Sequence, residues 1–280
     1  MSIDLIEPVE YDYVSAKIRQ FFKQKGLIEV AAQHRLSILA ACEDVRTIAT
    51  FEYIGQVWAL PQTSQMWLEY ELLTKPDVAG YFSFATSYRA EPDGIIGRHN
   101  LIFPMIEFEI HGDLNDLMNF ERELLEHFGY GSKESFPEGD YLDVCEKYGV
   151  DELTHEHEQK LYDDYGPVFF LKNFPETTSP FWNMKRDNES GLAKKCDVIM
   201  SGIETIGSAE RSCDVEDMRN KFYTISDGEY ALTLFSRFGK KRVIDELDTF
   251  LKHPFIKRVG AGIGVTRLIR SLKKENLMFK

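Results

Sequence analysis

The chain has 280 residues, of which 43% are hydrophobic and 28% charged, with 20 Phe and 13 Tyr. This composition is typical of a packed globular protein and excludes a disordered chain, and the length fits a single domain over residues 1–280. The formal net charge of −13 disfavours a large nucleic-acid-binding surface, because an acidic protein repels a phosphate backbone.

The first segments alternate helical and extended patterns. Residues 8–25 carry apolar side chains at helical spacing, and Gly26 follows as a stop signal before the strand-like residues 27–30. The aromatic and aliphatic run at 51–60 predicts one strand, and residues 64–73 return to a helical period. We therefore expect helix, strand, strand and helix in this part of the chain.

Two longer strands follow, at residues 81–90 and 101–110, joined by the charged, glycine-containing residues 91–100. Two apolar runs that bracket a loop with glycine predict an antiparallel hairpin. This hairpin carries most of the chemistry discussed below.

The second half of the chain contains further helices and strands. We expect helices at 115–128 and 216–252, short surface helices in the acidic stretch 131–166, strands at 167–174 and 196–204, and a glycine-rich strand or turn running into a helix at 257–274. The strands do not alternate regularly with helices, which disfavours a parallel Rossmann sheet. The predicted fold class is α/β of the α+β kind, an antiparallel sheet flanked by helices.

The hairpin collects cations, an aromatic ring and carboxylates. Arg89 and Glu91 are two residues apart near the end of one strand, so their side chains share a face. The return segment contributes a further set: Arg98, His99, Phe103, Glu107 and Glu109. A nucleotide needs a guanidinium for its phosphate and an aromatic face for its base, and this set offers both. The alternative is a charged hairpin that pairs with itself.

Two segments of the chain resemble known motifs. Arg89-Ala90-Glu91, followed after a loop by residues 98–103 (Arg-His-Asn-Leu-Ile-Phe), is similar to motif 2 of the class II aminoacyl-tRNA synthetases. The glycine-rich residues 260–267, which end on an arginine at the start of a helix, resemble motif 3 of the same family. The resemblance extends over about residues 8–272 and implies the catalytic core of that family.

Three features narrow the resemblance to the aspartyl and asparaginyl branch. Residues 63–69 (Thr-Ser-Gln-Met-Trp-Leu-Glu) look like the branch's Ser-Gly-Gln-Leu-x-Leu-Glu segment, and residues 167–181 resemble its strand that ends in Pro-Phe-Tyr. Asp197, Glu204 and Arg211 follow at intervals of seven, as do two metal-binding acids and a substrate-binding arginine of the branch.

The resemblance implies an ATP site on the hairpin and at motif 3. Arg89 would hold the α-phosphate, Phe103 would stack on adenine, and Glu91 would lie near the base. Arg267 would steady the β- and γ-phosphates together with a residue of the motif 2 loop, either Arg98 or His99. Arg89 and Arg267 are thus the implied catalytic residues.

The resemblance also implies a metal pair and an amino-acid site. Asp197 and Glu204 would be Mg²⁺ ligands, which agrees with the preference of this ion for one or two carboxylates plus phosphate oxygens. Gln65 and Glu107 would contact the amino acid, and Arg211 would bind a carboxylate. The alternatives are a structural ion pair between Glu204 and Arg211 and a helix-capping role for Gln65.

The implied reaction is the formation of an adenylate. The substrate carboxylate attacks the α-phosphorus of ATP in line, Mg²⁺ and the arginines neutralise the developing charge, and pyrophosphate leaves. No covalent protein nucleophile is required.

The chain departs from the family in two ways that affect its partners. The resemblance to the catalytic core begins almost at Met1, without the anticodon-binding domain that precedes the core in this branch. With the acidic net charge, this disfavours tRNA as a partner. In motif 1, residues 31–33 read Ala-Ala-Gln where the family has a proline, although we still expect a homodimer.

Substitutions near the site favour an asparaginyl-type pocket. Leu68 stands where the aspartyl type has a lysine, Met105 is as in the asparaginyl type, and Ile102 replaces a family glutamate. The turn at residues 260–267 also resembles that of ammonia-dependent asparagine synthetase, a free-standing relative of this core.

The first functional hypothesis is therefore an AMP-forming ligase that converts aspartate to asparagine with ammonia. In this hypothesis Arg211 holds the α-carboxylate and Glu107 the α-amine, while the β-carboxylate faces ATP. The alternatives are a ligase that passes an activated amino acid to a non-tRNA amine, peptide or protein, and a non-catalytic binding module.

Two further features concern the compartment. The four cysteines, Cys42, Cys145, Cys196 and Cys213, lack C-x-x-C spacing, so neither a zinc site nor a disulfide framework is indicated. No apolar stretch approaches the roughly 18 residues of a membrane helix, and acids occupy the N-terminus where a signal peptide carries bases. We expect a cytoplasmic protein.

Overall fold

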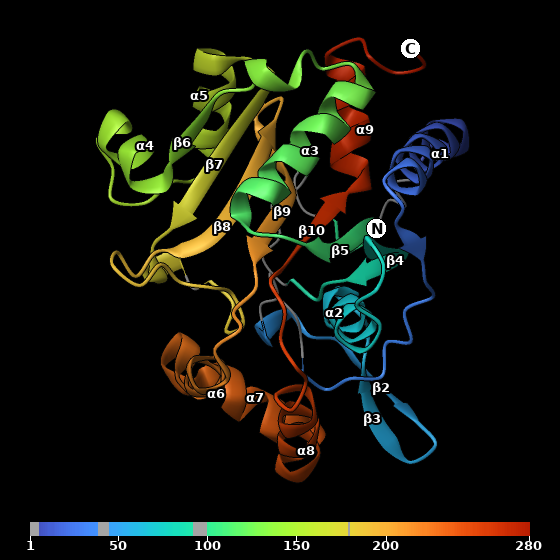
Figure 1. Cartoon of the computed structure of the whole chain (residues 1–280), viewed down its shortest axis with the longest axis vertical. Coiled ribbons are helices and arrows are strands. Elements are labelled where there is room, and N and C mark those ends of the chain that lie inside the picture. Colours follow the sequence, from blue (N-terminus) through green and yellow to red (C-terminus); the bar gives the residue numbers. More distant parts are fainter. Residues whose placement is uncertain (1–5, 39–44, 92–99, 179) are drawn as a thin grey trace.

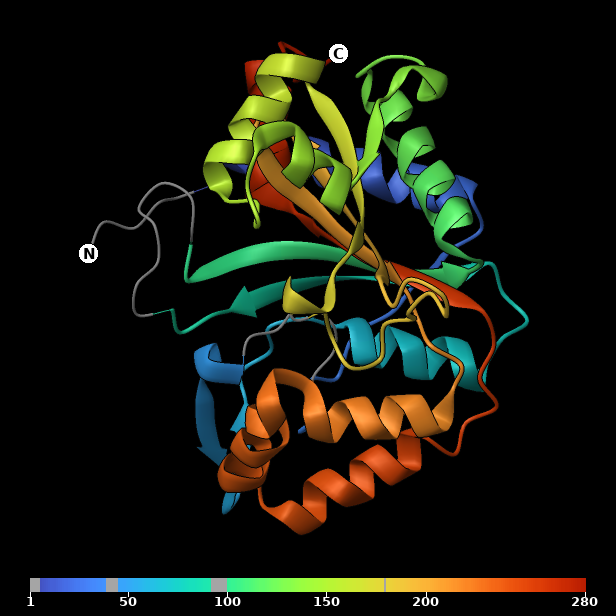
Figure 2. The same ribbon diagram turned by 90° about the vertical axis from the view of Figure 1, so that its left-hand side faces the viewer.

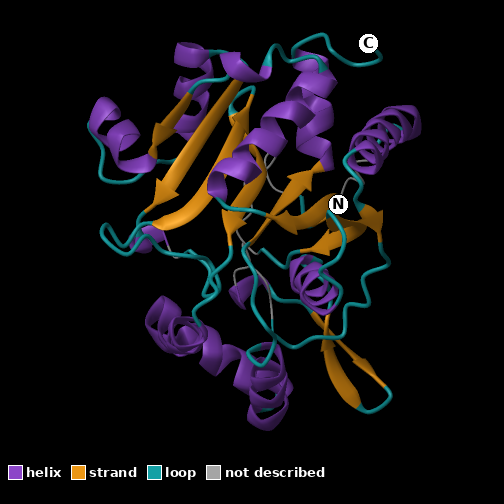
Figure 3. Ribbon diagram, in the orientation of Figure 1, coloured by secondary structure: helices purple, strands orange, loops and turns teal. Residues whose placement is uncertain are grey.

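The computed structural model describes residues 6–38, 45–91, 100–178 and 180–280. Its main feature is an eight-stranded sheet, shown in Figures 1 and 3. The strands of this sheet are β1 (Ile28–Glu29), β4 (Gly80–Tyr88), β5 (Ile102–His111), β6 (Glu138–Asp140), β7 (Val168–Phe174), β8 (Ala193–Met200), β9 (Ile203–Glu210) and β10 (Arg258–Gly264). They lie in the order β1-β4-β5-β10-β9-β8-β7-β6, and all neighbours are antiparallel except the parallel outer pairs β1–β4 and β6–β7. The antiparallel α+β prediction is confirmed.

Helices cover both faces of the sheet. They are α1 (Pro8–Gln24), α2 (Gln65–Thr74), α3 (Leu114–Phe128), α4 (Tyr141–Tyr148), α5 (His155–Tyr165), α6 (Val215–Thr224), α7 (Glu229–Phe238), α8 (Lys240–Phe250) and α9 (Val265–Lys274). Figure 2 shows the layers: α1, α3 and α9 lie on one side of the sheet, and α2 with α6, α7 and α8 lies on the other. A small hairpin, β2 (Thr50–Tyr53) with β3 (Gln56–Ala59), lies at the edge of the second layer.

The core between the sheet and the α1–α3–α9 layer is aromatic. The Phe22 ring of α1 lies 5.1 Å from that of Phe82 on β4 and 5.3 Å from that of Phe108 on β5. Offset and edge-on contacts of this kind add to the free energy gained from burying the rings. The apolar side chains that recur at helical spacing in residues 8–25 are therefore the ones with which α1 packs on the sheet.

Helix α3 is fixed at both ends. The Asp113 side chain accepts hydrogen bonds from the backbone N–H groups of Asn115 and Asp116, and the Asp116 carboxylate accepts one from the backbone of Asp113. Gly129 ends the helix with a left-handed φ of 92°. These are the two ordinary ways to satisfy the free backbone groups of helix termini.

Three sequence predictions need correction. Residues 51–60 form a hairpin and not one strand, because Ile54 and Gly55 adopt φ values of 51° and 70° and turn the chain back. Residues 196–204 likewise span two strands, β8 and β9, with a left-handed turn at 201–202. Residues 216–252 form three helices, interrupted by left-handed residues at 226–228 and at Gly239.

The other predicted elements are present. The helices predicted at 8–25, 64–73 and 115–128 correspond to α1, α2 and α3, each within one residue of the predicted bounds, and short helices lie within 131–166. The hairpin of residues 81–110 is antiparallel, and the chain closes with a glycine-rich strand that enters a helix. Over the ranges that the structure describes, no helix has both the length and the hydrophobicity required to cross a lipid bilayer.

Candidate active site

A cavity of about 700 Å³ lies between the sheet and the layer that contains α2 and α7. Eight residues named from the sequence line it: Gln65, Arg89, Glu91, Phe103, Glu107, Glu204, Arg211 and Arg267. They come from α2, β5, β9 and α9 and from the segments that follow β4 and β9. Asp197 is not among the lining residues, and Arg98 and His99 fall outside the described residues. The structure thus brings together most of the predicted set.

Glycines of β10 form part of the floor of this cavity. Gly260, Gly262 and Gly264 alternate with the buried residues 259, 261 and 263, so the strand presents bare backbone to the cavity and side chains to the core. A Cβ atom at position 260 would overlap Glu109 Oε2 and lie 2.7 Å from both Gln65 Oε1 and Arg211 Nη2. Glycine is therefore required there by close approach.

Two cations and a ring of the kind expected for a nucleotide line this cavity. The guanidinium carbon of Arg89 lies 5.5 Å from the centre of the Phe103 ring, at the ends of the β4–β5 hairpin. Arg267, in the first turn of α9, donates from Nη1 to the Glu204 backbone oxygen at 2.6 Å and lies 3.9 Å from its carboxylate. Glu91 also lines the cavity.

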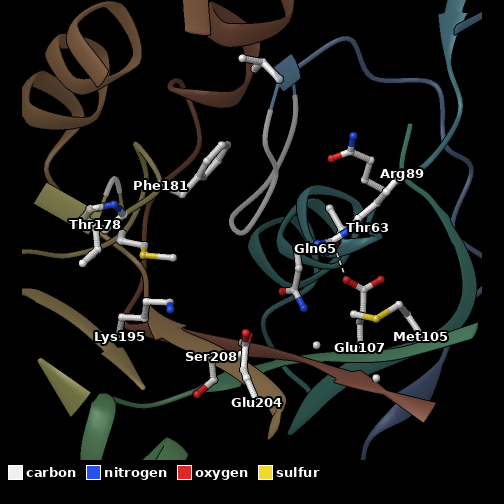
Figure 4. Close-up of a pocket in the computed structure, with 18 of the residues that line it drawn as sticks. Thr63, Gln65, Arg89, Met105, Glu107, Thr178, Phe181, Lys195, Glu204 and Ser208 are labelled. Carbon is white, nitrogen blue, oxygen red and sulfur yellow. Dashed lines mark hydrogen bonds between the residues drawn. The ribbon is translucent and has the colours of Figure 1, made fainter. Parts of the chain in front are cut away.

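Glu107 lies on the same side of the cavity as Arg89 and is held by the start of α2. Its carboxylate accepts the Ser64 N–H at 2.6 Å and the Thr63 hydroxyl, as Figure 4 illustrates for Thr63. Burial raises the pKa of Glu107, while these two hydrogen bonds and the charge of Arg89 act in the opposite direction. The carboxylate is thus fixed in place before any ligand binds.

Arg211 belongs to a buried network. Its guanidinium donates to Gln65 Oε1 at 2.8 Å and to both oxygens of Glu109 at 3.3 Å. Gln65 Nε2 in turn donates to the Ala261 backbone oxygen at 2.7 Å, so this side chain does not cap α2. Behind them, Arg258 donates to Glu69 at 2.7 and 2.9 Å, and both of these side chains are fully buried.

The two acids named as metal ligands differ in their surroundings. Glu204 lines the cavity, whereas Asp197 is buried with its Oδ2 atom 2.5 Å from Lys195 Nζ. The Asp197 Oδ1 atom is buried and has no hydrogen-bond partner within the described part of the chain. A carboxylate that lines the cavity and a buried carboxylate oxygen without a hydrogen-bond partner among the described residues are ligands of the kind that Mg²⁺ prefers, so Glu204 and Asp197 Oδ1 would suit such an ion. Among the described residues there is no group of three or more His, Cys, Asp or Glu that could hold a metal ion by itself.

The three substitutions singled out near the pocket separate in space. Met105 lines the cavity, Leu68 is fully buried and packs with Leu72 and Tyr81, and Ile102 is 62% exposed. Leu68 therefore acts on the cavity only through the packing of α2.

The sequence analysis missed the wall opposite Glu107. It contains Thr178, Phe181, Lys195, Asp227, Glu229 and Tyr230. Figure 4 shows Phe181 and Lys195 across the cavity from Arg89 and Glu107. The strand period could have identified Lys195, which is two residues before Asp197 and hence on the same face of β8. Thr178 and Phe181 lie within residues 167–181, whose resemblance to the branch identified the segment without giving these two residues a role, and no local signal marks Asp227, Glu229 and Tyr230.

Comparisons with known proteins give one consistent result. Residues 12–277 match the sequence profile described as tRNA synthetases class II (D, K and N). An aspartate–tRNA(Asp) ligase of Pyrobaculum aerophilum is 26% identical over 75% of this chain and 55% of its own length. The cytoplasmic asparagine–tRNA ligase of Dictyostelium discoideum is 24% identical over 92% of this chain and 42% of its own length. The chain thus spans about half the length of these relatives.

Solved structures show the same fold. The asparaginyl-tRNA synthetase of Pyrococcus horikoshii, complexed with asparaginyl-adenylate, matches with a TM-score of 0.77 at 22% identity, over 95% of this chain and 64% of that one. The Entamoeba histolytica asparaginyl-tRNA synthetase, also with asparaginyl-adenylate, matches with a TM-score of 0.74 at 17% identity, over 96% and 64%.

Proposed function

Because the match over residues 12–277 places this chain in the class II tRNA synthetase family, we propose that it uses ATP to activate an amino-acid carboxylate as an adenylate. The observation that supports this most directly is the meeting of two residue sets in one cavity. Arg89, Phe103 and Arg267 suit a nucleotide, and Glu107 with the Arg211 network suits an amino acid. A volume of about 700 Å³ is within the usual range for small-molecule sites.

In the proposed mechanism the chain positions its substrates and stabilises charge. Phe103 stacks on adenine, Arg89 binds the α-phosphate, and Arg267 binds the terminal phosphates. The substrate carboxylate attacks the α-phosphorus, and both arginines stabilise the negative charge as pyrophosphate leaves. A magnesium ion bound by Glu204 and Asp197 Oδ1 would supply further charge neutralisation. Fixed donors in a partly buried site act strongly because they do not reorganise during the reaction.

We propose aspartate as the substrate and ammonia as the acceptor. The α-amine of aspartate would bind the Glu107 carboxylate and its α-carboxylate the Arg211 network, which leaves the β-carboxylate towards ATP. Ammonia would then attack the acyl carbon of the β-aspartyl adenylate and lose a proton, releasing AMP and asparagine. The limited size of the cavity and Met105 in its wall support a small acceptor and an asparaginyl-type pocket.

A second acceptor class is favoured by the wall opposite Glu107. Asp227 and Glu229 both line the cavity there, beside Tyr230. Carboxylates next to an aromatic ring suit a cationic amine, so the alternative is a ligase that passes the activated amino acid to a larger amine, peptide or protein. Since the relatives include aspartate–tRNA and asparagine–tRNA ligases, tRNA is a further acceptor to test.

The proposed assembly is a homodimer that acts in the cytoplasm. The two-residue strand β1 lies at one edge of the sheet, with Ile28 42% exposed. An exposed sheet edge of this kind can be covered by a second chain. Light scattering on the purified protein tests the dimer, and a monomer at all concentrations would reject it.

The test of function is to incubate the protein with ATP, Mg²⁺ and aspartate, with and without ammonium, and to measure AMP, pyrophosphate and asparagine by mass spectrometry. Asparagine formed with AMP only when ammonium is present would support the synthetase proposal. Pyrophosphate exchange without asparagine would direct the search to amine, peptide, protein and tRNA acceptors. No exchange with either aspartate or asparagine would reject adenylate formation from these substrates.

Variants on one helix link the reaction to the site. Arg267→Ala should lower the rate by roughly 100-fold or more, because a fixed donor to the phosphates is removed. Arg270→Ala is the matched control, since Arg270 lies on the same helix and is exposed. Equal rates for the two variants would contradict the site as described.

A further inference from the structure

Lys195 is a cation that lines the cavity from β8 and that did not emerge from the family resemblance. It precedes Asp197 by two residues on β8, so both side chains leave the same face of the sheet. Its Nζ atom lies 2.5 Å from Asp197 Oδ2 and 3.9 Å from the centre of the Phe174 ring. Lys195 lines the cavity, and Asp197 is not among the lining residues.

The surroundings of Asp197 require a positive charge. Its carboxylate is buried, Glu204 lies close by on β9, and Glu158 of α5 accepts the backbone N–H of Glu204 at 2.7 Å. Buried carboxylates that lie close together stay ionised only where a nearby cation compensates their charge, and here the chain places Lys195 against Asp197.

We propose that Lys195 acts as a tethered cation, that is, a positive charge supplied by the chain at a position that a divalent cation would otherwise take. This position is beside Asp197 Oδ2, on the side of the cavity where we place the phosphates. The metal would then share Asp197 Oδ1 and Glu204, and Lys195 would neutralise Oδ2 in its absence. In Figure 4 the Lys195 ammonium and the Glu204 carboxylate both point into the cavity from neighbouring strands. The part of this inference that concerns nucleotide rests on the proposed function.

Two consequences distinguish a tethered cation from a structural ion pair. Without Lys195, the free carboxylate of Asp197 should bind a divalent cation more tightly, because a competing charge has been removed. Nucleotide binding should at the same time depend more strongly on the metal, because the chain no longer supplies that charge itself. A purely structural pair would change the stability of the protein and neither of these quantities.

The first experiment uses the metal alone. Mn²⁺ is titrated into nucleotide-free protein and followed by electron paramagnetic resonance, for the wild type, Lys195→Met and Lys194→Met. Lys194 is the matched control, because it is the preceding residue of β8 and pairs with Asp187 at 3.1 Å. We expect Lys195→Met to bind Mn²⁺ about tenfold more tightly than the wild type, and Lys194→Met to match the wild type. A tenfold change is a modest part of the effect that Coulomb's law allows for the removal of a charge at this distance.

Asp197 provides the internal check. The double variant Lys195→Met/Asp197→Asn should lose the gain in Mn²⁺ affinity, because the gain depends on that carboxylate. Lys195→Arg should keep the affinity of the wild type, and it tests the inference even where the methionine variant folds poorly. Circular dichroism confirms the fold of each variant. Equal Mn²⁺ affinity in the wild type and folded Lys195→Met would overturn the inference.

The second experiment adds a non-cleavable ATP analogue with a methylene group between its α- and β-phosphorus atoms. Calorimetry measures its affinity with Mg²⁺ and with EDTA. We expect the loss of affinity in EDTA to be about tenfold larger for Lys195→Met than for the wild type, and an equal loss would also count against the inference. If no variant binds the analogue but the Mn²⁺ difference is present, the proposed function fails and the tethered cation stands. If the analogue binds, and neither its metal dependence nor the Mn²⁺ affinity differs between Lys195→Met and the wild type, the tethered cation is rejected and the proposed nucleotide site stands.

Discussion

The two faces of the sheet treat buried charge differently. On the face that lines the cavity, Arg258 is paired with Glu69 and Arg211 with Glu109, all of them almost wholly buried. On the face beneath α3, Glu121 is fully buried, and neither of its carboxylate oxygens has a hydrogen-bond partner in the described part of the chain. Burial raises the pKa of Glu121 to about 8. One face keeps its charges by pairing them, and the other holds a carboxyl that keeps its proton at neutral pH.

The comparison shows what each face contributes. Paired charges have fixed directions, so the cavity face can hold polar groups ready for a ligand. The face beneath α3 gains its stability from apolar burial and aromatic packing, and neither of these requires charged groups. The substitutions below separate these contributions.

The largest effect is expected at the glycine floor. In Gly260→Ala the new methyl group overlaps Glu109 and must displace Arg211 or Gln65, so we expect a loss of roughly 5 kcal/mol of stability together with loss of activity. Gly262→Ala is the matched control, because its nearest neighbour is the flexible end of Met105 at 2.8 Å. Chemical denaturation measures both, and similar losses for the two variants would contradict a special role for position 260.

Adjacent residues on β5 should separate stability from activity. Phe108→Ala empties a site among the rings of Phe22 and Phe120 and should cost about 4 kcal/mol of unfolding free energy. Glu107→Gln should lower adenylate formation by roughly 100-fold and leave stability within about 1 kcal/mol. Denaturation and pyrophosphate exchange measure the pair, and the same pattern in both variants would remove the distinction between the faces.

The buried pair on the cavity face should be costly to break. Arg258→Met leaves the Glu69 carboxylate buried without its cation, and we expect a loss of about 3 kcal/mol. The double variant Arg258→Met/Glu69→Met should recover part of this loss, because no lone charge remains. A double variant less stable than Arg258→Met would contradict the explanation that the single variant loses stability because a lone charge is left buried.

The last expected effect concerns Glu121 and appears only as the pH is raised. The unfolded chain releases the Glu121 proton near the ordinary pKa of glutamate, and the folded chain holds it until about pH 8. Between these values the folded state binds more protons, so the free energy of unfolding falls as the pH rises. Glu121→Gln removes this dependence and should be more stable than the wild type at about pH 9, with a smaller difference at about pH 5. Parallel stability curves for the two proteins would contradict a proton held by Glu121.

Most of the residues that we propose for the nucleotide and the amino acid could be named from the sequence, because they lie in short motifs, and the structure brings them to one cavity. The hairpin of residues 81–110 and the helix that follows the glycine strand place Arg89, Phe103 and Arg267 within single motifs. The turns at 54–55 and 201–202 were missed because each lies inside an apolar run and is decided by one glycine and its neighbour.

Only part of the opposite wall could be predicted, because most of it is built by tertiary contact. Phe181 ends the segment 167–181 that resembles the branch, whereas Asp227 lies between α6 and α7 and Tyr230 in the first turn of α7. Only the fold brings the Tyr230 ring to 5.4 Å from that of Phe181 at the cavity. Lys195 could be placed on the same strand face as Asp197 from the sequence, but the importance of this pair became clear only from the distance between the two side chains. The alternation of lysine and aspartate on one strand is common, and the 2.5 Å contact gives it significance.

The bare backbone of β10 also bears on how such a site can change over generations. Since Gly260, Gly262 and Gly264 offer a ligand no side chains, the choice between ligands falls to the walls, which come from α2, β5, β8 and α7. Replacement of a wall residue can alter what is recognised and leave the central strand, with its pairing to β5 and β9, intact. Selection can therefore act on recognition and on foldability separately, and a single scaffold can acquire new ligands in small steps.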